Sequence, residues 1–413
     1  MHRRFKVWMN AKRQGRQRVP QDPEIPLLPN PRPYALTPSP SQEQITTLAE
    51  TIPFFRLPLE LRRKILVHAF GNRTVHIDLA LTYPLGEPRN DGSSFRSINP
   101  KLRYHSPGIH LWPYNQEHLG LDREQPKYWQ WRGCVCHRLR PPRFKTPVDF
   151  HTIVKPTDDK CCEGRSFYCA LYSHPKFTDK PDSCWIGAMG WLLTCRQAYV
   201  EGTEILYGTN IIHISSQPLI NNLGVLIRPR SLSMITSLEI VFYLSTHEHQ
   251  GKIVPSQPEL ERYLQMLDTH FPQLISLHLG IRVENPVLDV PPRYEVIRRP
   301  VYLSDMLQSV DAFVKRRRDQ PELCNLRDPF LLSIPQAAYK ALTKEVRDDN
   351  RYYVRKSGAQ IWRPISAESI VLDDEGELTN ATPENGYWTW GDYEDRFELE
   401  FNRPPPQMNC FGT

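Results

Sequence analysis

The chain has 413 residues, a formal net charge of +6 and a mean hydropathy of −0.52. This length allows a substantial core and two or three domains. The 39 prolines keep long stretches out of helix and central strand, because proline lacks the backbone donor. No run approaches the roughly 20 apolar residues that cross a bilayer, and the N-terminus lacks a secretory apolar core. We therefore expect an intracellular protein without a membrane segment, whose nine cysteines are reduced thiols.

Residues 1–50 form a basic and proline-rich segment. The first 21 residues contain seven Lys and Arg and no acid. Such a run is a nuclear address, a polyanion-binding element or a solvated tail. Prolines then recur every third residue from Pro20 to Pro29, which is the period of polyproline II. We predict a disordered tail over the whole segment.

Residues 51–83 carry the first regular pattern, FFRLPLELRRKILVHAFG at 54–71. Proline suits the first turn of a helix, and Gly71 supplies its stop. Apolar residues recur along one side, so the helix has an apolar stripe that packs either on the protein's own sheet or on a partner. The stripe contains Leu57, Pro58, Leu61 and Ile65. A half-buried strand is expected over 75–79, where apolar and polar residues alternate.

Residues 84–183 lose this period and are predicted to be an irregular insertion rich in Cys, Trp and Arg. Zinc needs four soft ligands in a tetrahedron, and the insertion contains enough thiols. The candidate ligands are Cys134, Cys136, His137, Cys161 and Cys162. Their spacing lacks the C-x-x-C knuckle, so we expect no cofactor, with a structural zinc as the alternative to cysteines that pack a loop.

Basic and aromatic residues interleave within the insertion over 127–145. Arginines for phosphates and aromatic rings for base stacking are what single-stranded nucleic-acid binding needs. The candidate residues are Trp129, Trp131, Arg132, Arg138, Arg140 and Arg143. Alternatively, the tryptophans anchor the insertion on the body and the arginines are solvated.

Regular patterns resume in the segment 184–350. Alternating helix and strand patterns predict an α/β layer with largely parallel strands. The expected strands are 211–214, 238–244, 275–283 and 330–334, and the expected helices are 191–208, 219–226, 260–271, 304–318 and 336–346. Two strand entries also fit L-x-x-L-x-L, the opening of a leucine-rich repeat. The matching residues are Ile235, Leu238, Ile240 and Leu274, Leu277, Leu279.

The segment 351–413 is acidic and aromatic. Residues 366–401 contain eleven acids and one base, which gives −10 and leaves +16 on the rest of the chain. Phe397, Leu399 and Phe401 alternate with glutamates, so part of the segment should be ordered, as an edge strand.

Two patterns together carry a family resemblance. LP-x-x-L-x-x-x-I opens F-box motifs, and L-x-x-C-R-x-x-Y within 191–210 is how the later part of an F-box reads. They resemble a large family of uncharacterised filamentous-fungal proteins with an F-box-like start, over 53 to about 340. The resemblance implies that Leu57, Pro58, Leu61 and Ile65 dock on the Skp adaptor of a cullin-type ubiquitin ligase.

The expected fold class is therefore α/β. It consists of an F-box-like helix and an irregular α/β layer or degenerate leucine-rich-repeat-like body, with the long insertion and the N-terminal tail. Phosphate-loop, H-E-x-x-H, G-x-S-x-G and Rossmann motifs are absent from the sequence, and Cys195 falls on an apolar stripe as a structural rather than a nucleophilic cysteine. We predict a non-enzymatic protein-interaction module, an F-box-like substrate receptor. Nucleic-acid binding through 127–145 is the alternative.

Overall fold

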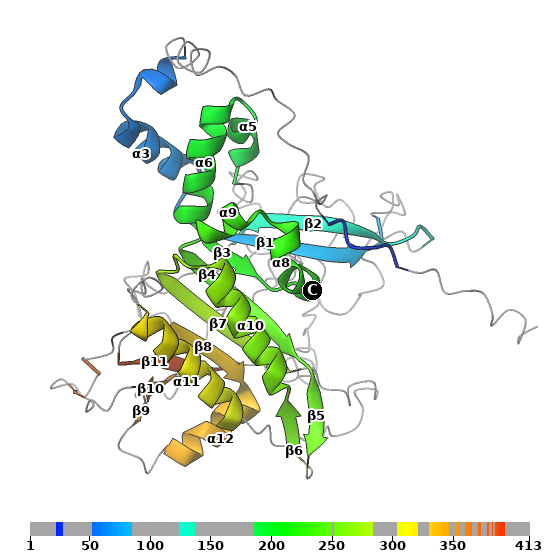
Figure 1. The fold of residues 1–413 in the computed structure, drawn as a ribbon, viewed down its shortest axis with the longest axis vertical. Coiled ribbons are helices and arrows are strands. Elements are labelled where there is room, and N and C mark those ends of the chain that lie inside the picture. The colour runs from blue at the N-terminus through cyan, green and yellow to red at the C-terminus, as the bar shows by residue number, and fades with distance from the viewer. Residues whose placement is uncertain are drawn as a thin grey trace, which may run out of the picture.

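The structure is a computed structural model that describes residues 22–27, 52–84, 124–136, 186–249, 252–283, 304–320, 330–346, 352–354, 360–365, 371–372, 378–379, 382 and 385–392. Within these residues the protein is a mixed α/β fold, as the alternating patterns predict. One nine-stranded sheet runs through it, and α10, α11 and α12 lie in front of its lower half in Figure 1. None of the described helices combines the length and apolar character needed to span a bilayer.

The sheet is mainly parallel, with the order β2-β1-β3-β4-β7-β8-β11-β10-β9. Six strands from β1 to β11 are mutually parallel, whereas β2 at one edge and β10 and β9 at the other run antiparallel to their neighbours. The strands are β1 (Thr74–Thr82), β2 (Tyr128–Val135), β3 (Ile211–Ile214), β4 (Ser237–Leu244), β7 (Ser276–Val283), β8 (Phe330–Pro335), β9 (Tyr353–Val354), β10 (Gln360–Pro364) and β11 (Gly386–Asp392). A separate antiparallel pair consists of β5 (Thr246–His249) and β6 (Lys252–Pro255).

The helices that follow the parallel strands β3, β4, β7 and β8 gather on one face of the sheet, because each new parallel strand is added on the same side of the one before it. With right-handed crossovers, this order brings every connecting helix to the same face. The helices are η1 (Pro53–Arg56), α3 (Leu59–Phe70), α5 (Ala188–Leu192), α6 (Arg196–Gly208), α7 (Gln217–Asn221), α8 (Leu223–Leu226), α9 (Pro229–Ser233), α10 (Gln257–His270), α11 (Ser304–Asp319) and α12 (Gln336–Val346).

The main core lies between the sheet and the helices α7 to α12. Alternate residues of β4, Leu238, Ile240 and Phe242, are almost completely buried, as are Leu264 and Leu267 of α10. Complete burial of such side chains contributes roughly 1.5–3 kcal/mol each. The period of two in the strands and of about 3.6 in the helices therefore fixes which face of each element turns inward.

A polar cluster joins α11 to β10 and β11. Arg363 donates two hydrogen bonds to Asp311, at 2.9 and 2.7 Å, and the Tyr387 hydroxyl donates to the same carboxylate at 2.7 Å. Burial of the phenol, followed by the Asp311 charge, raises the pKa of Tyr387 well above its ordinary value. The cluster thus satisfies a carboxylate inside the layer and links the late strands to the helical face.

Most elements expected in the body are confirmed. The predicted strands correspond to β3, β4, β7 and β8, and the predicted long helices correspond to α10, α11 and α12. The sheet also joins strands from four of the five segments outlined in the sequence, since β1, β2 and β9 to β11 flank the body. The alternation at 397–401 lies outside the described residues.

Four expectations are wrong. The helix predicted over 219–226 is two short helices, α7 and α8, because Asn222 between them leaves the helical conformation with a φ of −126°. The helix predicted over 191–208 is two helices, because the half-buried Cys195 takes an extended conformation and its Sγ caps α6 by accepting from the Ala198 amide at 3.4 Å. Residues 128–135, expected to be irregular, form β2 and pair with β1 along its length. Ile25, expected in a disordered tail, packs against the main core.

Candidate functional site

Three helices, α3, α5 and α6, pack together beyond the amino-terminal ends of β1 and β3, at the top of Figure 1. They enclose a small core of their own, separate from the main one. The buried residues of this core are Leu66, Phe70, Ala188, Leu192 and Ile205. These helices therefore form a distinct module attached to one end of the sheet, and we call them the three-helix module.

Aromatic contacts close the module at its outer end. Phe54 and Phe55 of η1 lie 4.6 and 5.8 Å from the Trp191 ring, measured between ring centroids. Gly202 allows α6 to approach α5, because a Cβ atom there would lie 2.6 Å from Leu192 Cδ2 and 2.9 Å from the Trp191 ring. A larger side chain at position 202 would therefore force the Leu192 and Trp191 side chains to move.

An ion pair fastens α3 to α6. Arg62 donates from Nε and Nη2 to the two carboxylate oxygens of Glu201, at 3.0 and 2.8 Å. Its Nη1 also donates to the backbone oxygens of Phe55 and Leu57, at 3.1 and 2.6 Å. Both charged side chains are only 12 and 13% exposed. A bidentate pair of this kind fixes the orientation of the helix as well as its position.

Asn210 clasps the ends of α3 and α6 where they meet the sheet. Its fully buried amide donates to the backbone oxygens of Phe70, at 2.9 Å, and Leu206, at 3.0 Å. Its Oδ1 accepts from the Arg73 amide at 2.8 Å. One side chain therefore satisfies one carbonyl oxygen near the end of each helix. The turn is completed by Asn72, whose left-handed φ of 54° is one that asparagine tolerates.

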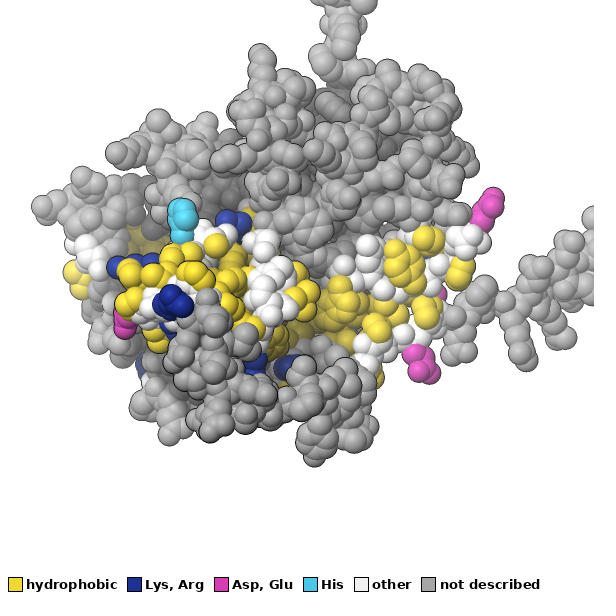
Figure 2. All heavy atoms as spheres, turned by 90° about the horizontal axis from the view of Figure 1, so that it is seen from above, with side chains coloured by type: hydrophobic (Ala, Val, Ile, Leu, Met, Phe, Trp, Pro, Cys, Tyr) yellow, Lys and Arg dark blue, Asp and Glu magenta, His cyan; other side chains and the backbone are white. Residues whose placement is uncertain are grey.

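The outer side of α3 is an exposed apolar face. Leu61 and Ile65, one turn apart, are 45 and 46% exposed. Pro58 is exposed and Leu57 is half-buried. The stripe singled out in the sequence thus faces away from the module core, and we call Pro58, Leu61 and Ile65 the α3 face. Figure 2 looks down on this end of the molecule and shows hydrophobic side chains gathered with Lys and Arg side chains.

Further apolar side chains are exposed on the same three helices. Leu59 at the start of α3 is 56% exposed, Met189 on α5 is 63% exposed and Leu193, which follows α5, is 78% exposed. Large exposed aliphatic groups gathered on a small module typically mark a binding surface. The module therefore presents more apolar surface than its own core uses.

The candidate zinc ligands are only partly within the described residues. Cys134 is buried on β2, and Cys136, just after it, is half-buried. His137, Cys161 and Cys162 lie outside the described residues. Among the residues that the structure describes, no group of three or more His, Cys, Asp or Glu side chains is arranged to hold a metal ion.

The candidate nucleic-acid residues divide in the same way. Trp129 is half-buried against the main core, and its indole N–H donates to the Pro23 oxygen at 2.8 Å. Trp131 is 46% exposed. The backbone of Arg132 follows that of Trp131 on β2. Arg138, Arg140 and Arg143 lie outside the described residues. One of the two tryptophans is thus engaged in anchoring, as the alternative interpretation expects.

A row of polar side chains crosses the sheet on the face away from the main core. His76, His213, Glu239 and His278 stand opposite one another on β1, β3, β4 and β7. His213 Nδ1 lies 3.2 Å from a Glu239 oxygen, the His76 and His213 ring centroids are 4.4 Å apart, and His278 Nε2 lies 2.8 Å from the Ser333 hydroxyl. The alternation of each strand predicts the face, but the register that aligns the four residues has no local signal.

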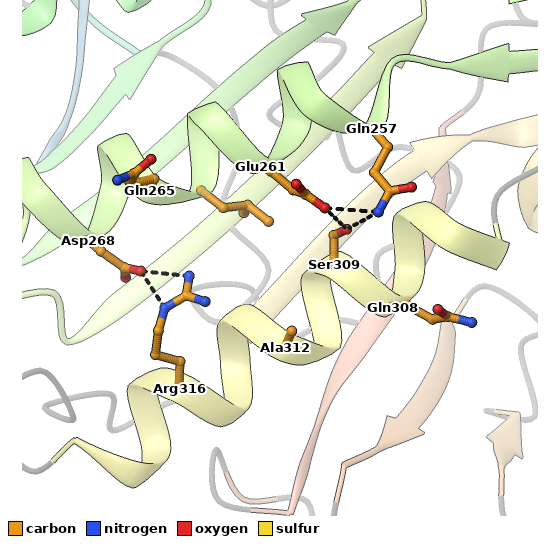
Figure 3. Close-up of a pocket in the computed structure, with 9 residues that line it drawn as sticks. Gln257, Glu261, Gln265, Asp268, Gln308, Ser309, Ala312 and Arg316 are labelled. Atoms are coloured by element: carbon orange, nitrogen blue, oxygen red, sulfur yellow. Dashed lines mark hydrogen bonds and ion pairs between the residues drawn. The ribbon is translucent and has the colours of Figure 1, made fainter.

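An open groove between α10 and α11 is lined by polar residues that bond to one another (Figure 3). Gln257 donates to Glu261 at 2.8 Å, and Ser309 of α11 donates to the same carboxylate at 3.2 Å. At the other end Arg316 donates to Asp268 at 2.9 Å. These bonds connect the two helices, so the groove is explained by their packing.

Comparisons of the chain with protein-family models, with curated proteins and with solved structures find no match.

Proposed function

We propose that the protein is a non-enzymatic, F-box-like substrate receptor whose α3 face docks on the Skp adaptor of a cullin-type ubiquitin ligase. The observation that carries the proposal is the exposure of Leu61 and Ile65 on a helix whose opposite side already contributes to a core. A stripe that packed on the protein's own sheet would be buried. Its availability to solvent favours an intermolecular contact over an internal one.

The packing of the two segments that carry the F-box-like patterns also supports the proposal. The LP-x-x-L-x-x-x-I pattern forms the start of α3, and the L-x-x-C-R-x-x-Y pattern spans the end of α5 and the start of α6. More than a hundred residues separate the two patterns in the chain, yet Arg62 and Glu201 hold them together. This packing supports the interpretation of the module as F-box-like.

We assign target recognition to the α/β body, which resembles a short, degenerate leucine-rich-repeat-like layer. Its two L-x-x-L-x-L strands, β4 and β7, are adjacent, parallel and in register, with Leu238 opposite Leu277 and Ile240 opposite Leu279. The mechanism is apposition: the body holds the target while the α3 face holds the ligase. The chain itself makes and breaks no covalent bond in this role.

Nucleic-acid binding through 127–145 has less support from the described residues. Tyr128 and Trp131 are 42 and 46% exposed, but they are three positions apart on β2 and therefore point to opposite faces of the strand. Two rings on opposite faces do not form one stacking platform. Nucleic-acid binding stays the alternative function, and RNA-binding measurements on the full chain will exclude or establish it.

The proposed function is tested with the full chain and a recombinant Skp adaptor. Leu61→Asp combined with Ile65→Asp should weaken adaptor binding at least 30-fold, an order-of-magnitude figure, because burying an unpaired carboxylate in an apolar contact costs several kcal/mol. Val225→Asp, at a site 48% exposed on α8, is the matched control and should bind normally. Circular dichroism should show all variants folded. A wild-type chain that does not bind the adaptor at micromolar concentration would end this proposal.

A further inference from the structure

A cationic groove runs along α3 beside the apolar α3 face. It has a volume of about 730 Å³ and continues to the turn after the helix. It is lined by Glu60, Arg63, Lys64, Val67, His68, Gly71, Asn72 and Arg73. Glu60 is the one acidic residue among these, against three Lys and Arg side chains, so the groove has a positive potential at neutral pH.

Two of these cations are not used within the part of the chain that the structure describes. Arg62, on the inner side of α3, has its charge matched by Glu201. Arg63 and Lys64, the next two residues, are exposed and have no ion-pair partner among the described residues. Adjacent positions of one helix therefore differ in role, with one charge bound internally and two directed to solvent.

The groove and the α3 face are neighbours on the helix surface. Residues three and four positions apart lie side by side on a helix, so Lys64 and His68 adjoin Leu61 and Ile65. A partner that covers the two aliphatic side chains necessarily meets these basic groups. Its surface must then provide apolar side chains for the α3 face and negative charges for the groove, because uncompensated cations at a contact rim weaken binding and slow encounter.

We propose that α3 recognises an acidic protein segment, one that places apolar side chains on Leu61 and Ile65 and carboxylates against Lys64 beside them and Arg63 further around the helix in the same groove. For its apolar half the inference rests on the proposed function. The charge complementarity of the groove specifies the occupant's chemistry, which the apolar face alone does not. A nucleic acid offers phosphates to the groove but leaves the aliphatic side chains uncovered.

Selection from a displayed library of random 16-residue peptides tests the proposal without assuming a partner. The full chain is the bait, and the Leu61→Asp/Arg63→Glu/Lys64→Glu variant removes clones that bind elsewhere. The expected survivors are enriched both in Asp and Glu and in Leu, Ile or Phe. Survivors that are apolar without acids, or basic, would overturn the proposal, and so would a selection that yields none.

Charge reversal then measures how much the basic residues of the groove contribute to peptide affinity. For a selected peptide, Arg63→Glu/Lys64→Glu should reduce affinity about tenfold or more at 50 mM salt, and the difference should shrink at 500 mM salt because exposed charges are screened. Lys315→Glu/Lys344→Glu, at two exposed lysines on α11 and α12 distant from α3, is the matched control and should have no effect. A single-stranded RNA 16-mer that binds wild type and loses binding in the groove variant, but not in Leu61→Asp, would overturn the assignment to protein.

The two proposals fail in different ways. Acidic peptides that bind at α3 while the Skp adaptor does not would preserve the groove assignment and remove the adaptor. The opposite result is adaptor binding that depends on Leu61 but is unchanged by salt and by Arg63→Glu/Lys64→Glu, together with selected peptides that lack acids. It would preserve the adaptor and remove the groove assignment.

Discussion

The ion pair between Arg62 and Glu201 should set how firmly α3 is held in the three-helix module. Arg62→Met keeps the aliphatic stem but removes four hydrogen bonds, two of them to a carboxylate that is 13% exposed. Net contributions of hydrogen bonds to charged groups are about 1.5–3 kcal/mol each. Two such bonds to the carboxylate would total about 3–6 kcal/mol. Because Gln197 still donates to the Glu201 carboxylate at 2.9 Å, we expect about half of this loss, about 1.5–3 kcal/mol.

Hydrogen exchange measured by mass spectrometry reports this local stability directly. A loss of about 1.5–3 kcal/mol corresponds to exchange roughly 10- to 150-fold faster in peptides from 54–70, with peptides from β4 and β7 unchanged. Arg262→Met is the matched control, because Arg262 is 62% exposed and pairs with Glu259 at 3.6 Å. Such a surface pair contributes at most about 1 kcal/mol.

A double-mutant cycle with Glu201→Gln separates the pair from the rest of the side chain. The coupling free energy between positions 62 and 201 should exceed about 1 kcal/mol. A coupling below about 0.3 kcal/mol, or unchanged exchange in 54–70, would refute the reasoning and show that apolar packing alone positions α3.

Three other substitutions and one pH titration of the wild type have defined outcomes. Asn210→Ala, which removes all three clasp bonds, should lower the free energy of unfolding by about 2–4 kcal/mol in denaturant titrations and accelerate exchange in both α3 and α6. Asp311→Asn should destabilise the late strands by about 1–3 kcal/mol, with a lower denaturation midpoint. The pKa of Tyr387 is raised above 10, so in the wild type this residue's contribution to the free energy of unfolding is complete below pH 10. The contribution should fall as the pH rises further, and tyrosine absorbance reports the ionisation of the phenol. Burial lowers the pKa of His270 below 6.5, so stability present above pH 6.5 should fall on acidification, and His270→Gln should flatten this slope in pH-dependent melting curves.

The body was predictable because its patterns are local. In β7, Leu277, Leu279 and Ile281 alternate with His278, Gly280 and Arg282, and this local alternation is enough to identify a strand. β2 was missed although Trp129 and Trp131 also alternate. Its pairing with β1 bridges a long connection, and loop-closure over such a distance leaves no trace in the local sequence.

The candidate site was predictable in its residues but not in its exposure. Periodicity placed Leu61 and Ile65 on one stripe, yet the same stripe suits an internal and an external contact. The exposure of this stripe depends on Arg62 and Asn210, because their hydrogen bonds to partners about 140 positions away in sequence hold the opposite side of α3 inward. Polar residues that bond over such separations have no sequence signature of their own.

The short connections between the module and the sheet also determine a geometry. Three residues, 71–73, separate α3 from β1, and two, 209–210, separate α6 from β3. Because an α-helix turns about 100° per residue, the length of each connection sets the direction in which Leu61 and Ile65 point relative to the strands. A molecule bound to α3 is thus held at a fixed distance from the body and in a fixed orientation. Its effective concentration at the body is therefore set by the two short connections and not by the motion of a flexible linker.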